Sequence, residues 1–307
     1  MMKIFDLGIA YNWEYDVDFV LKVENQLQSL GISTYVIHPN NVLEVKEDLL
    51  RKNLSFNTYI DRAWDVDERF EEVGKILQRR RTRMFNPYKN VTHAIDKASM
   101  HLEFITAGLN VPHSIIIPPH SQEANIFLSV EDLAILGRPF IIKPCNTTGG
   151  GIGVVTGAES LKEVLSERVA YNNDKYLIQE KIYPNVINGK RTWFRCFWSF
   201  DKVISVLWDD QTHVYSMIDD ELKAHINTKK LNQITKTIFD ITNLDFFSTE
   251  VVLTADNKYM VIDYVNDQCD MRLKSKHADG VPDEIVDQII ASLAKAVKKI
   301  SSIPNHS

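Results

Sequence analysis

Cysteine is scarce in this sequence, and its cysteines are far apart in the chain. The three of them are Cys145, Cys196 and Cys269. An odd number at such wide spacing does not suggest a disulfide framework, and no Cys-x-x-Cys pair is present to suggest a zinc site. The pattern indicates a reducing compartment, and we expect a cytoplasmic protein.

Long apolar runs and an excess of positive charge are also missing. No apolar run approaches the roughly 20 residues that span a bilayer, and the N-terminus lacks the apolar segment of a secretory signal. The chain has 35 Lys and Arg against 41 Asp and Glu, a formal net charge of -6. That balance argues against broad binding to nucleic acid, which needs a clustered basic face. We expect neither a membrane nor a nucleic-acid partner.

The sequence does have the patterning of a globular α/β protein. Its 307 residues exceed a comfortable single core, so two domains or a domain with subdomains are expected. Up to residue 88, strands alternate with helices, which is typical of βαβ units and a mainly parallel sheet. The expected strands are residues 3–10, 33–38 and 55–60, and the expected helices are residues 16–30 and 67–80.

From residue 92 the pattern becomes mixed, with aromatic-rich strands and tight turns. Helices are expected at residues 92–107, 129–136, 160–169, 229–242 and 283–300. Strands are expected at residues 111–118, 140–143, 153–156, 176–182, 192–200, 202–208, 248–253 and 259–264. Short turns near residues 201 and 256 predict antiparallel pairs. We predict three parts: residues 1–88, 89–178 and 179–307.

A glycine-rich loop after a strand-end lysine is the strongest local signal. Lys143 ends an apolar strand, and a second strand follows the loop. Glycines let backbone N–H groups approach phosphate oxygens closely. The segment is not a P-loop, because no Gly-Lys-Ser/Thr opens a helix. A hairpin loop without a ligand is the alternative. The loop residues predicted to bind phosphate are Thr147, Thr148, Gly149, Gly150, Gly151 and Gly153.

Two acidic residues interrupt apolar strands of the expected hairpin. Glu250 and Asp263 are thirteen residues apart, and pairing of their strands would bring both carboxylates to one side. An unpaired charge is costly in such a strand. With the amide oxygen of Asn266 they would form a hard oxygen site that suits magnesium. Ordinary solvated charge on an amphipathic hairpin is the alternative.

Two further polar segments carry weaker signals. The strand end formed by Gln179, Glu180, Lys181 and Ile182 could offer backbone groups to an adenine, or could simply be a strand reaching the surface. Arg272 and Lys274 follow the second acidic strand. They could hold an anionic substrate, and a solvated basic run is an equally good explanation.

Taken in order, these segments resemble the ATP-grasp superfamily, which includes D-alanine–D-alanine ligase, glutathione synthetase and glutamate-ligating enzymes. The resemblance covers about residues 92–272 and, more loosely, the N-terminal part. It implies an α/β (α+β) fold in which a small parallel α/β domain precedes two α+β subdomains that enclose the nucleotide. The resemblance implies that Lys97, Lys143 and the glycine loop bind the phosphates and that Gln179 to Ile182 lie beside the adenine. It implies that Glu250 and Asp263 are the metal carboxylates. Arg191 or Arg195 would neutralise the transferred phosphoryl group.

The resemblance also implies a reaction. It is an ATP-dependent ligation of a carboxylate to an amine through an acyl phosphate, with one or two Mg²⁺ ions, or Mn²⁺ in their place. The substrates would be small molecules or peptides, and a homodimer is conceivable. A kinase-like phosphotransferase and a non-catalytic nucleotide-binding module are the alternatives. The chain departs from the family's Glu-x-Asn ending, because it has the shorter acid Asp263 and two residues, not one, before Asn266. Asp267 could therefore compete with Asn266 as a metal ligand.

Overall fold

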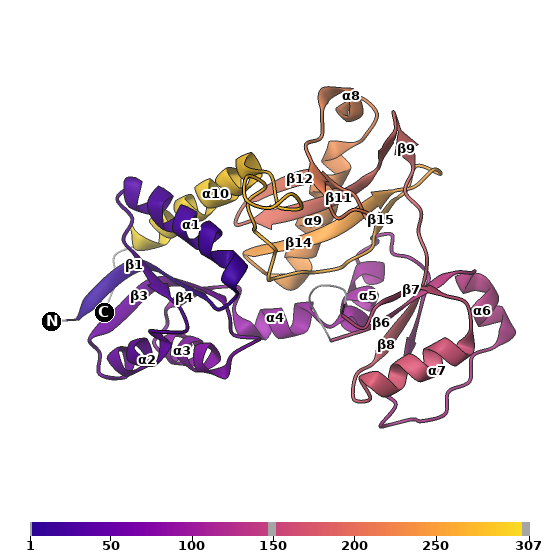
Figure 1. The fold of residues 1–307 in the computed structure, drawn as a ribbon, viewed down its shortest axis with the longest axis horizontal. Coiled ribbons are helices and arrows are strands. Elements are labelled where there is room, and N and C mark those ends of the chain that lie inside the picture. Colours follow the sequence, from indigo (N-terminus) through magenta and orange to yellow (C-terminus); the bar gives the residue numbers. More distant parts are fainter. Residues whose placement is uncertain (1, 147–151, 303–307) are drawn as a thin grey trace.

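A parallel sheet forms the N-terminal layer of the protein. The computed structural model describes residues 2–146 and 152–302. Strands β1 (Lys3–Tyr11), β2 (Thr34–Ile37), β3 (Leu54–Arg62) and β4 (Arg83–Phe85) lie in the order β2-β1-β3-β4 with every pair parallel. Helices α2 (Val42–Leu50) and α3 (Glu68–Arg79) lie together on one side of this sheet, and α1 (Val17–Ser29), which follows the short 3-10 helix Glu14–Asp16, lies on the other (Figure 1). The predicted parallel α/β part is confirmed.

A small antiparallel sheet forms the second layer. Strands β5 (Ser114–Ile117), β6 (Phe140–Pro144), β7 (Val155–Ala158) and β8 (Tyr176–Glu180) lie in the order β5-β8-β6-β7. Helices α6 (Val130–Leu136) and α7 (Leu161–Ala170) cover its outer face. Each of these helices begins with a capping box, in which Ser129 or Ser160 accepts a hydrogen bond from the backbone three residues on. These caps explain why both helix starts could be predicted closely.

A larger antiparallel sheet forms the third layer. It consists of β11 (Trp193–Ser199), β12 (Lys202–Trp208), β13 (Tyr215–Ser216), β14 (Phe246–Leu253) and β15 (Tyr259–Val261), in the order β13-β12-β11-β14-β15. Helix α9 (Thr228–Thr242) packs against one face of it. The short strands β9 (Val186–Ile187) and β10 (Lys190–Arg191) pair only with each other within the described residues, near the short helix α8 (Asp220–Lys223) (Figure 1).

Two helices link the first layer to the second where we predicted one. The expected helix at residues 92–107 is helical over most of its length but is interrupted: α4 (Tyr88–Ala94) ends, and α5 (Lys97–Thr106) begins anew. Asp96 starts the second helix, because its carboxylate accepts hydrogen bonds from the backbone N–H groups of Ala98 and Ser99. The same carboxylate pairs with Lys175, which lies at the start of β8. This break makes Lys97 the first residue of α5.

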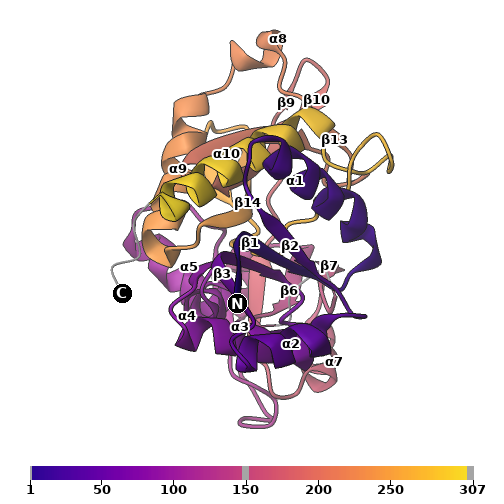
Figure 2. The same ribbon diagram turned by 90° about the vertical axis from the view of Figure 1, so that its left-hand side faces the viewer.

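The last helix returns to the first sheet. Helix α10 (Asp283–Ser301) packs against α1, β1 and β3 and also against β11 and β12 (Figure 2). One apolar core therefore combines Leu7 and Val20 with Phe197, Ile289 and Leu293. The division at residues 88 and 178 stays a prediction.

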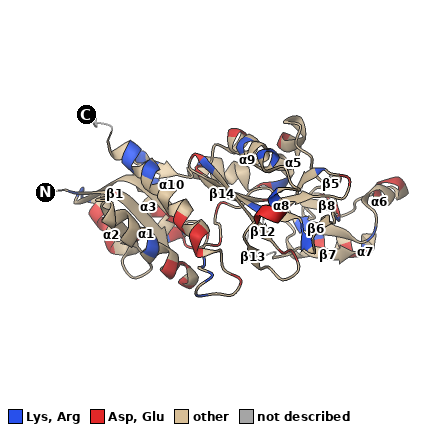
Figure 3. Ribbon diagram, turned by 90° about the horizontal axis from the view of Figure 1, so that it is seen from above, with Lys and Arg blue, Asp and Glu red and all other residues tan. Residues whose placement is uncertain are grey.

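Basic residues mark the last turn of α10, where cations interact favourably with the helix dipole (Figure 3). No described helix has the length and apolar character that a membrane span requires.

Candidate functional site

Lys143 reaches from the small sheet to the large one. Its Nζ donates a hydrogen bond to the carbonyl oxygen of Ile262, 3.1 Å away. Burial lowers the pKa of this amine, and the nearby charge of Lys97 lowers it further. The carboxylates of Asp263 and Glu250 act in the opposite direction and raise it. The structure therefore brings four predicted side chains, those of Lys97, Lys143, Glu250 and Asp263, into one region.

The start of α5 is fixed to the end of β6. The backbone N–H of Lys97 donates to the carbonyl oxygen of Cys145, 3.0 Å away. The next N–H groups of this turn, those of Ala98 and Ser99, donate to the Asp96 carboxylate, so the backbone of this helix start is already paired. Any attraction for a phosphate at this helix end therefore comes from the charge of the Lys97 side chain and from the helix dipole.

Most of the glycine loop lies outside the described residues. That holds for Thr147, Thr148, Gly149, Gly150 and Gly151. Gly153 is described, and its backbone has a φ of +72°. A Cβ atom added there would lie 2.6 Å from a ring carbon of Tyr171. Conformation and space therefore both require glycine at this position.

The acidic pair lies on the hairpin of β14 and β15, where the ladder is irregular. Val251 pairs with Val261, but Ser248 pairs with Asn266, so three steps along one strand match five along the other. Within this bulge, the backbone of Glu250 accepts a hydrogen bond from Ile262 N–H and donates one to the carbonyl oxygen of Asp263. Bulges of this kind redirect side chains next to functional sites. Here the bulge lies between the pairs Val251–Val261 and Ser248–Asn266, so it includes both Glu250 and Asp263.

An arginine from the neighbouring strand contacts both carboxylates. Nη2 of Arg195 lies 2.7 Å from Oε1 of Glu250, and Nη1 lies 4.0 Å from Oδ2 of Asp263. Burial raises the pKa of Glu250, the Arg195 charge opposes that rise, and Asp263 adds to it. Arg191, the other predicted arginine, is instead held by both carboxylate oxygens of Asp210. The structure places Arg195, and not Arg191, beside the acidic pair.

Two tryptophan side chains support this pair directly. The indole N–H of Trp193 donates to Oε2 of Glu250 over 2.9 Å. The guanidinium of Arg195 lies over the ring of Trp208, 5.0 Å from its centre. Sequence reasoning missed both roles. The available signal was the alternation of Trp193 and Arg195 on one face of a strand, opposite Glu250.

The predicted adenine-side segment forms the end of β8 and the residues after it. Gln179 is buried, and its Nε2 donates to the hydroxyl oxygens of Ser114 and Tyr264. The carboxylate of Glu180 accepts a hydrogen bond from the backbone N–H of His113. Lys181 and Ile182 follow β8 and are partly exposed. This polar strand end lies at the opposite end of β8 from Lys175.

The residues predicted at the end of the metal strand have separate surroundings. Asn266 pairs with Ser248 through the backbone. Asp267 is buried, and burial together with the charge of Asp65 raises its pKa to about 6. Arg272 is paired with Asp270 and Asp279. Lys274 donates to the carbonyl oxygen of Tyr215. The two predicted substrate cations thus already have partners within the protein.

His101 forms a buried contact behind the lysine, with its Nδ1 2.5 Å from the hydroxyl oxygen of Tyr264. Burial lowers the pKa of His101 from 6.5 to about 4, helped by the charges of His113 and Lys143. The unfolded chain therefore binds a proton that the folded chain does not. Stability should fall as the pH drops from 6.5 towards 4, by about 2 kcal/mol between pH 7 and pH 5.

The measurement is urea unfolding of the wild type and of His101→Gln at both pH values. Glutamine can still bond to Tyr264 but does not titrate, so the variant should lack this part of the pH dependence. His93, an exposed residue of α4, gives a control. The His93→Gln variant should keep the wild-type slope. An unchanged slope in His101→Gln would show that another group causes the effect.

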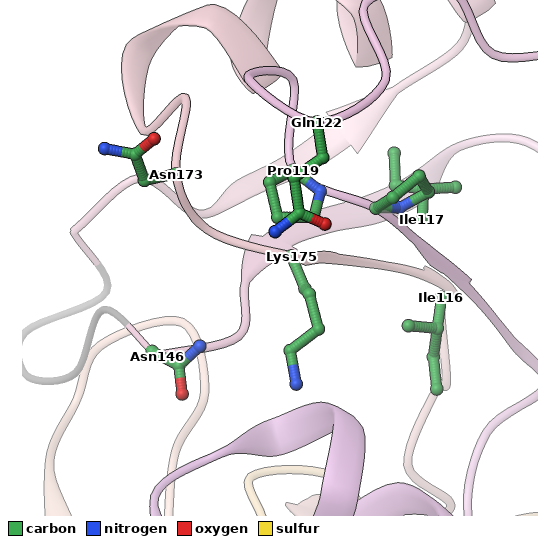
Figure 4. Close-up of a pocket in the computed structure, with 8 residues that line it drawn as sticks. Ile116, Ile117, Pro119, Gln122, Asn146, Asn173 and Lys175 are labelled. Atoms are coloured by element: carbon green, nitrogen blue, oxygen red, sulfur yellow. The ribbon is translucent and has the colours of Figure 1, made fainter.

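A cavity of about 420 Å³ opens at the other end of the small sheet, away from the acidic pair. Lys175, Gln122, Asn146 and Asn173 surround it together with an apolar wall that includes Ile116 and Pro119 (Figure 4). Neither Lys143 nor either carboxylate lines it. The charged cluster, and not this cavity, is therefore the candidate site.

Comparison with known proteins gives a clear result for the fold. No family model and no curated protein matches the sequence. The RimK domain ATP-grasp protein from Sphaerobacter thermophilus has a TM-score of 0.62 at 15% identity, covering 94% of this chain and 98% of its own. D-cycloserine synthetase has a TM-score of 0.62 at 16% identity, covering 96% and 100%. D-alanine–D-alanine ligase from Bacillus anthracis, solved with ATP, has a TM-score of 0.60 at 15% identity, covering 95% and 98%.

The chain has the ATP-grasp fold. The predicted fold is thereby confirmed over nearly the whole chain, including its N-terminal layer.

The ATP-grasp fold implies a nucleotide and a divalent ion, and the residues present fit both. In the described residues no cluster of three or more His, Cys, Asp or Glu side chains could hold a metal by itself. Glu250 and Asp263 nevertheless converge on one cation, the Arg195 guanidinium. Magnesium typically takes one or two protein carboxylates and completes its shell with phosphate oxygens and water. Two carboxylates opposite two lysines match that pattern.

Proposed function

We propose that this protein is an ATP- and Mg²⁺-dependent ligase that joins a carboxylate to an amine through an acyl phosphate. One observation carries the proposal: buried Lys143 and Arg195 meet Glu250 and Asp263 between the two antiparallel sheets. The ATP-grasp fold supports it, since the similar structures include D-cycloserine synthetase, D-alanine–D-alanine ligase and the ATP-grasp ligase PsnB, which was solved with a minimal precursor, Mg and ADP.

In the proposed site, the basic residues would bind the phosphates and the acidic residues would bind the metal ion. Lys97, Lys143 and the glycine loop would hold the phosphates, and residues 179–182 would bind the adenine. Glu250 and Asp263, with Asn266 as a third candidate, would hold Mg²⁺. The ion would neutralise phosphate charge, which is most of what phosphoryl transfer requires of an active site. Arg195 would stabilise the charge on the transferred phosphoryl group.

The proposed reaction has two steps. An oxygen of the substrate carboxylate attacks the γ-phosphorus, the bond to the β-phosphate oxygen breaks, and ADP leaves. The amine nitrogen then attacks the acyl carbon, inorganic phosphate leaves with the bonding electron pair, and the amine loses a proton. Small-molecule and peptide substrates both remain candidates, and a monomer and a homodimer are both compatible with the proposal.

The test uses the full-length protein with ATP, Mg²⁺ and a library of carboxylates and amines. A thermal-shift screen comes first, because a ligand that binds only the native state raises the melting temperature. Positive carboxylates are then incubated with hydroxylamine, which traps an acyl phosphate as a hydroxamate. Formation of hydroxamate, ADP and free phosphate is expected. A stable phosphate ester would indicate a phosphotransferase, and nucleotide binding without any hydrolysis would indicate a binding module.

A further inference from the structure

The Arg195 guanidinium is the cation that pairs with both acidic side chains, Glu250 and Asp263. Its side chain is nearly buried, with 11% of its surface exposed. One terminal nitrogen contacts Glu250 at 2.7 Å, and the other lies 4.0 Å from Asp263 and 3.4 Å from the hydroxyl oxygen of Ser248. Trp208 supports the guanidinium from one side. This arginine is therefore the counter-ion of the whole pair.

The contacts of Arg195 leave one donor unused. Among the described residues, its Nε is buried and has no hydrogen-bond partner. A buried donor without an acceptor is unfavourable, so the guanidinium gains from an acceptor that pairs with Nε. A phosphate group suits this role, because two of its oxygens can accept from Nε and from a terminal nitrogen at the same time. The arginine is thus bound firmly to Glu250 but not completely satisfied there.

A metal ion and this guanidinium oppose each other on the same carboxylates. Both are cations, and at contact distance in a buried site the repulsion between them is strong. Trp193 fixes the second oxygen of Glu250, so the carboxylate cannot simply turn to serve two cations. The metal therefore binds well only once the guanidinium has left Glu250.

We propose that Arg195 is a resident counter-ion that excludes the metal until a nucleotide arrives. The nucleotide's phosphate draws the guanidinium away from Glu250, and the freed acidic pair then accepts the metal. This proposal rests on the proposed function, since it uses the same site. It goes further by making metal binding dependent on the nucleotide through one side chain, in addition to the phosphate ligands that the nucleotide itself supplies.

The test measures binding of Mn²⁺ alone to the full-length protein by electron paramagnetic resonance of the free ion. The Arg195→Gln variant should bind Mn²⁺ about tenfold or more tightly than the wild type, because the competing charge is gone. The variant Arg83→Gln is the matched control, since it removes an equal charge from an exposed side chain, which pairs with the partly buried Asp245. Its affinity should stay within about twofold of the wild type, since an exposed charge far from a site is screened. In Arg195→Gln/Glu250→Gln the gain should disappear, which would place the ion at Glu250.

Adding AMPPNP, an ATP analogue that keeps the γ-phosphate but does not transfer it, completes the test. AMPPNP should strengthen Mn²⁺ binding to the wild type by a larger factor than it strengthens binding to Arg195→Gln. Equal Mn²⁺ affinities in wild type and Arg195→Gln, with AMPPNP still bound by both, would overturn this inference and leave the proposed function intact. Absence of any nucleotide binding by the wild type would instead contradict the proposed function.

A second measurement needs no variant. Trp193 and Trp208 contact Glu250 and Arg195, so their fluorescence reports on the pair. AMPPNP without metal should change the tryptophan emission of the wild type, whereas Mn²⁺ without nucleotide should not do so at concentrations that saturate the AMPPNP complex. A response to Mn²⁺ alone at those concentrations would overturn the proposal even if Arg195→Gln failed to fold.

Discussion

Replacing Asp263 by asparagine is expected to abolish ATP turnover and to leave the fold intact. The substitution keeps the size of the side chain but removes the charge that the metal requires. Loss of one charge-stabilising group typically lowers turnover by at least about 100-fold. The fold should persist because the carbonyl oxygen of Asp263, and not its side chain, accepts the hydrogen bonds from Glu250 N–H and the Thr249 hydroxyl.

ADP release with saturating ATP and Mg²⁺ measures the effect, and circular dichroism with thermal melting checks the fold. Asp256 provides the matched control, because it is an exposed acid in the turn of the same hairpin and pairs with Lys258. Asp256→Asn should keep turnover within about twofold of the wild type, as expected for an exposed ion pair. Undiminished turnover in Asp263→Asn would remove Asp263 from the metal site.

The parts of the fold that could be predicted are those with strong local signals. Helices α6 and α7 begin at serines that cap them, and β12 follows a tight turn at Asp201 that forces an antiparallel pair. The break between α4 and α5 was missed because apolar periodicity continues across it and hides the local signal, the cap at Asp96. Asp96 also pairs with Lys175, which is far away in sequence and gives no local signal. Strands of two or three residues, such as β4 and β13, exist only because a longer strand lies beside them.

In the candidate site, too, the features with a local sequence signal could be predicted and those that depend on distant contacts could not. The hairpin pattern indicated correctly that β14 and β15 pair, and the structure places Glu250 and Asp263 around one cation. The sequence did not reveal the bulge that directs Asp263, since a bulge depends on the register of both strands. Nor could it choose between Arg191 and Arg195. The choice follows from pairing, because β10 joins β9 and so carries Arg191 to Asp210 and away from the acidic pair.

A buried ion pair at the junction of the first and third layers is expected to contribute strongly to the free energy of unfolding. Arg62, at the end of β3, contacts both carboxylate oxygens of Asp16 at 2.9 and 2.7 Å. It also donates to the carbonyl oxygen of Cys269, which follows the acidic hairpin, and lies over the ring of Phe19. Burial alone would lower the pKa of Arg62, but the Asp16 charge and hydrogen bonds raise it above its usual value. The pair thus fixes the loop after the acidic hairpin to the N-terminal sheet.

Arg62→Met is expected to lower the free energy of unfolding by about 3–5 kcal/mol, because it leaves the Asp16 carboxylate buried without a partner. The double variant Arg62→Met/Asp16→Leu should recover much of that loss, since both charges are then absent. Urea unfolding at pH 7 measures each variant. The exposed pair of Lys236 and Asp240 on α9 is the control, and Lys236→Met should cost less than about 1 kcal/mol. A double variant as unstable as Arg62→Met would mean that lost packing and the lost Cys269 contact, and not an uncompensated charge, determine the effect.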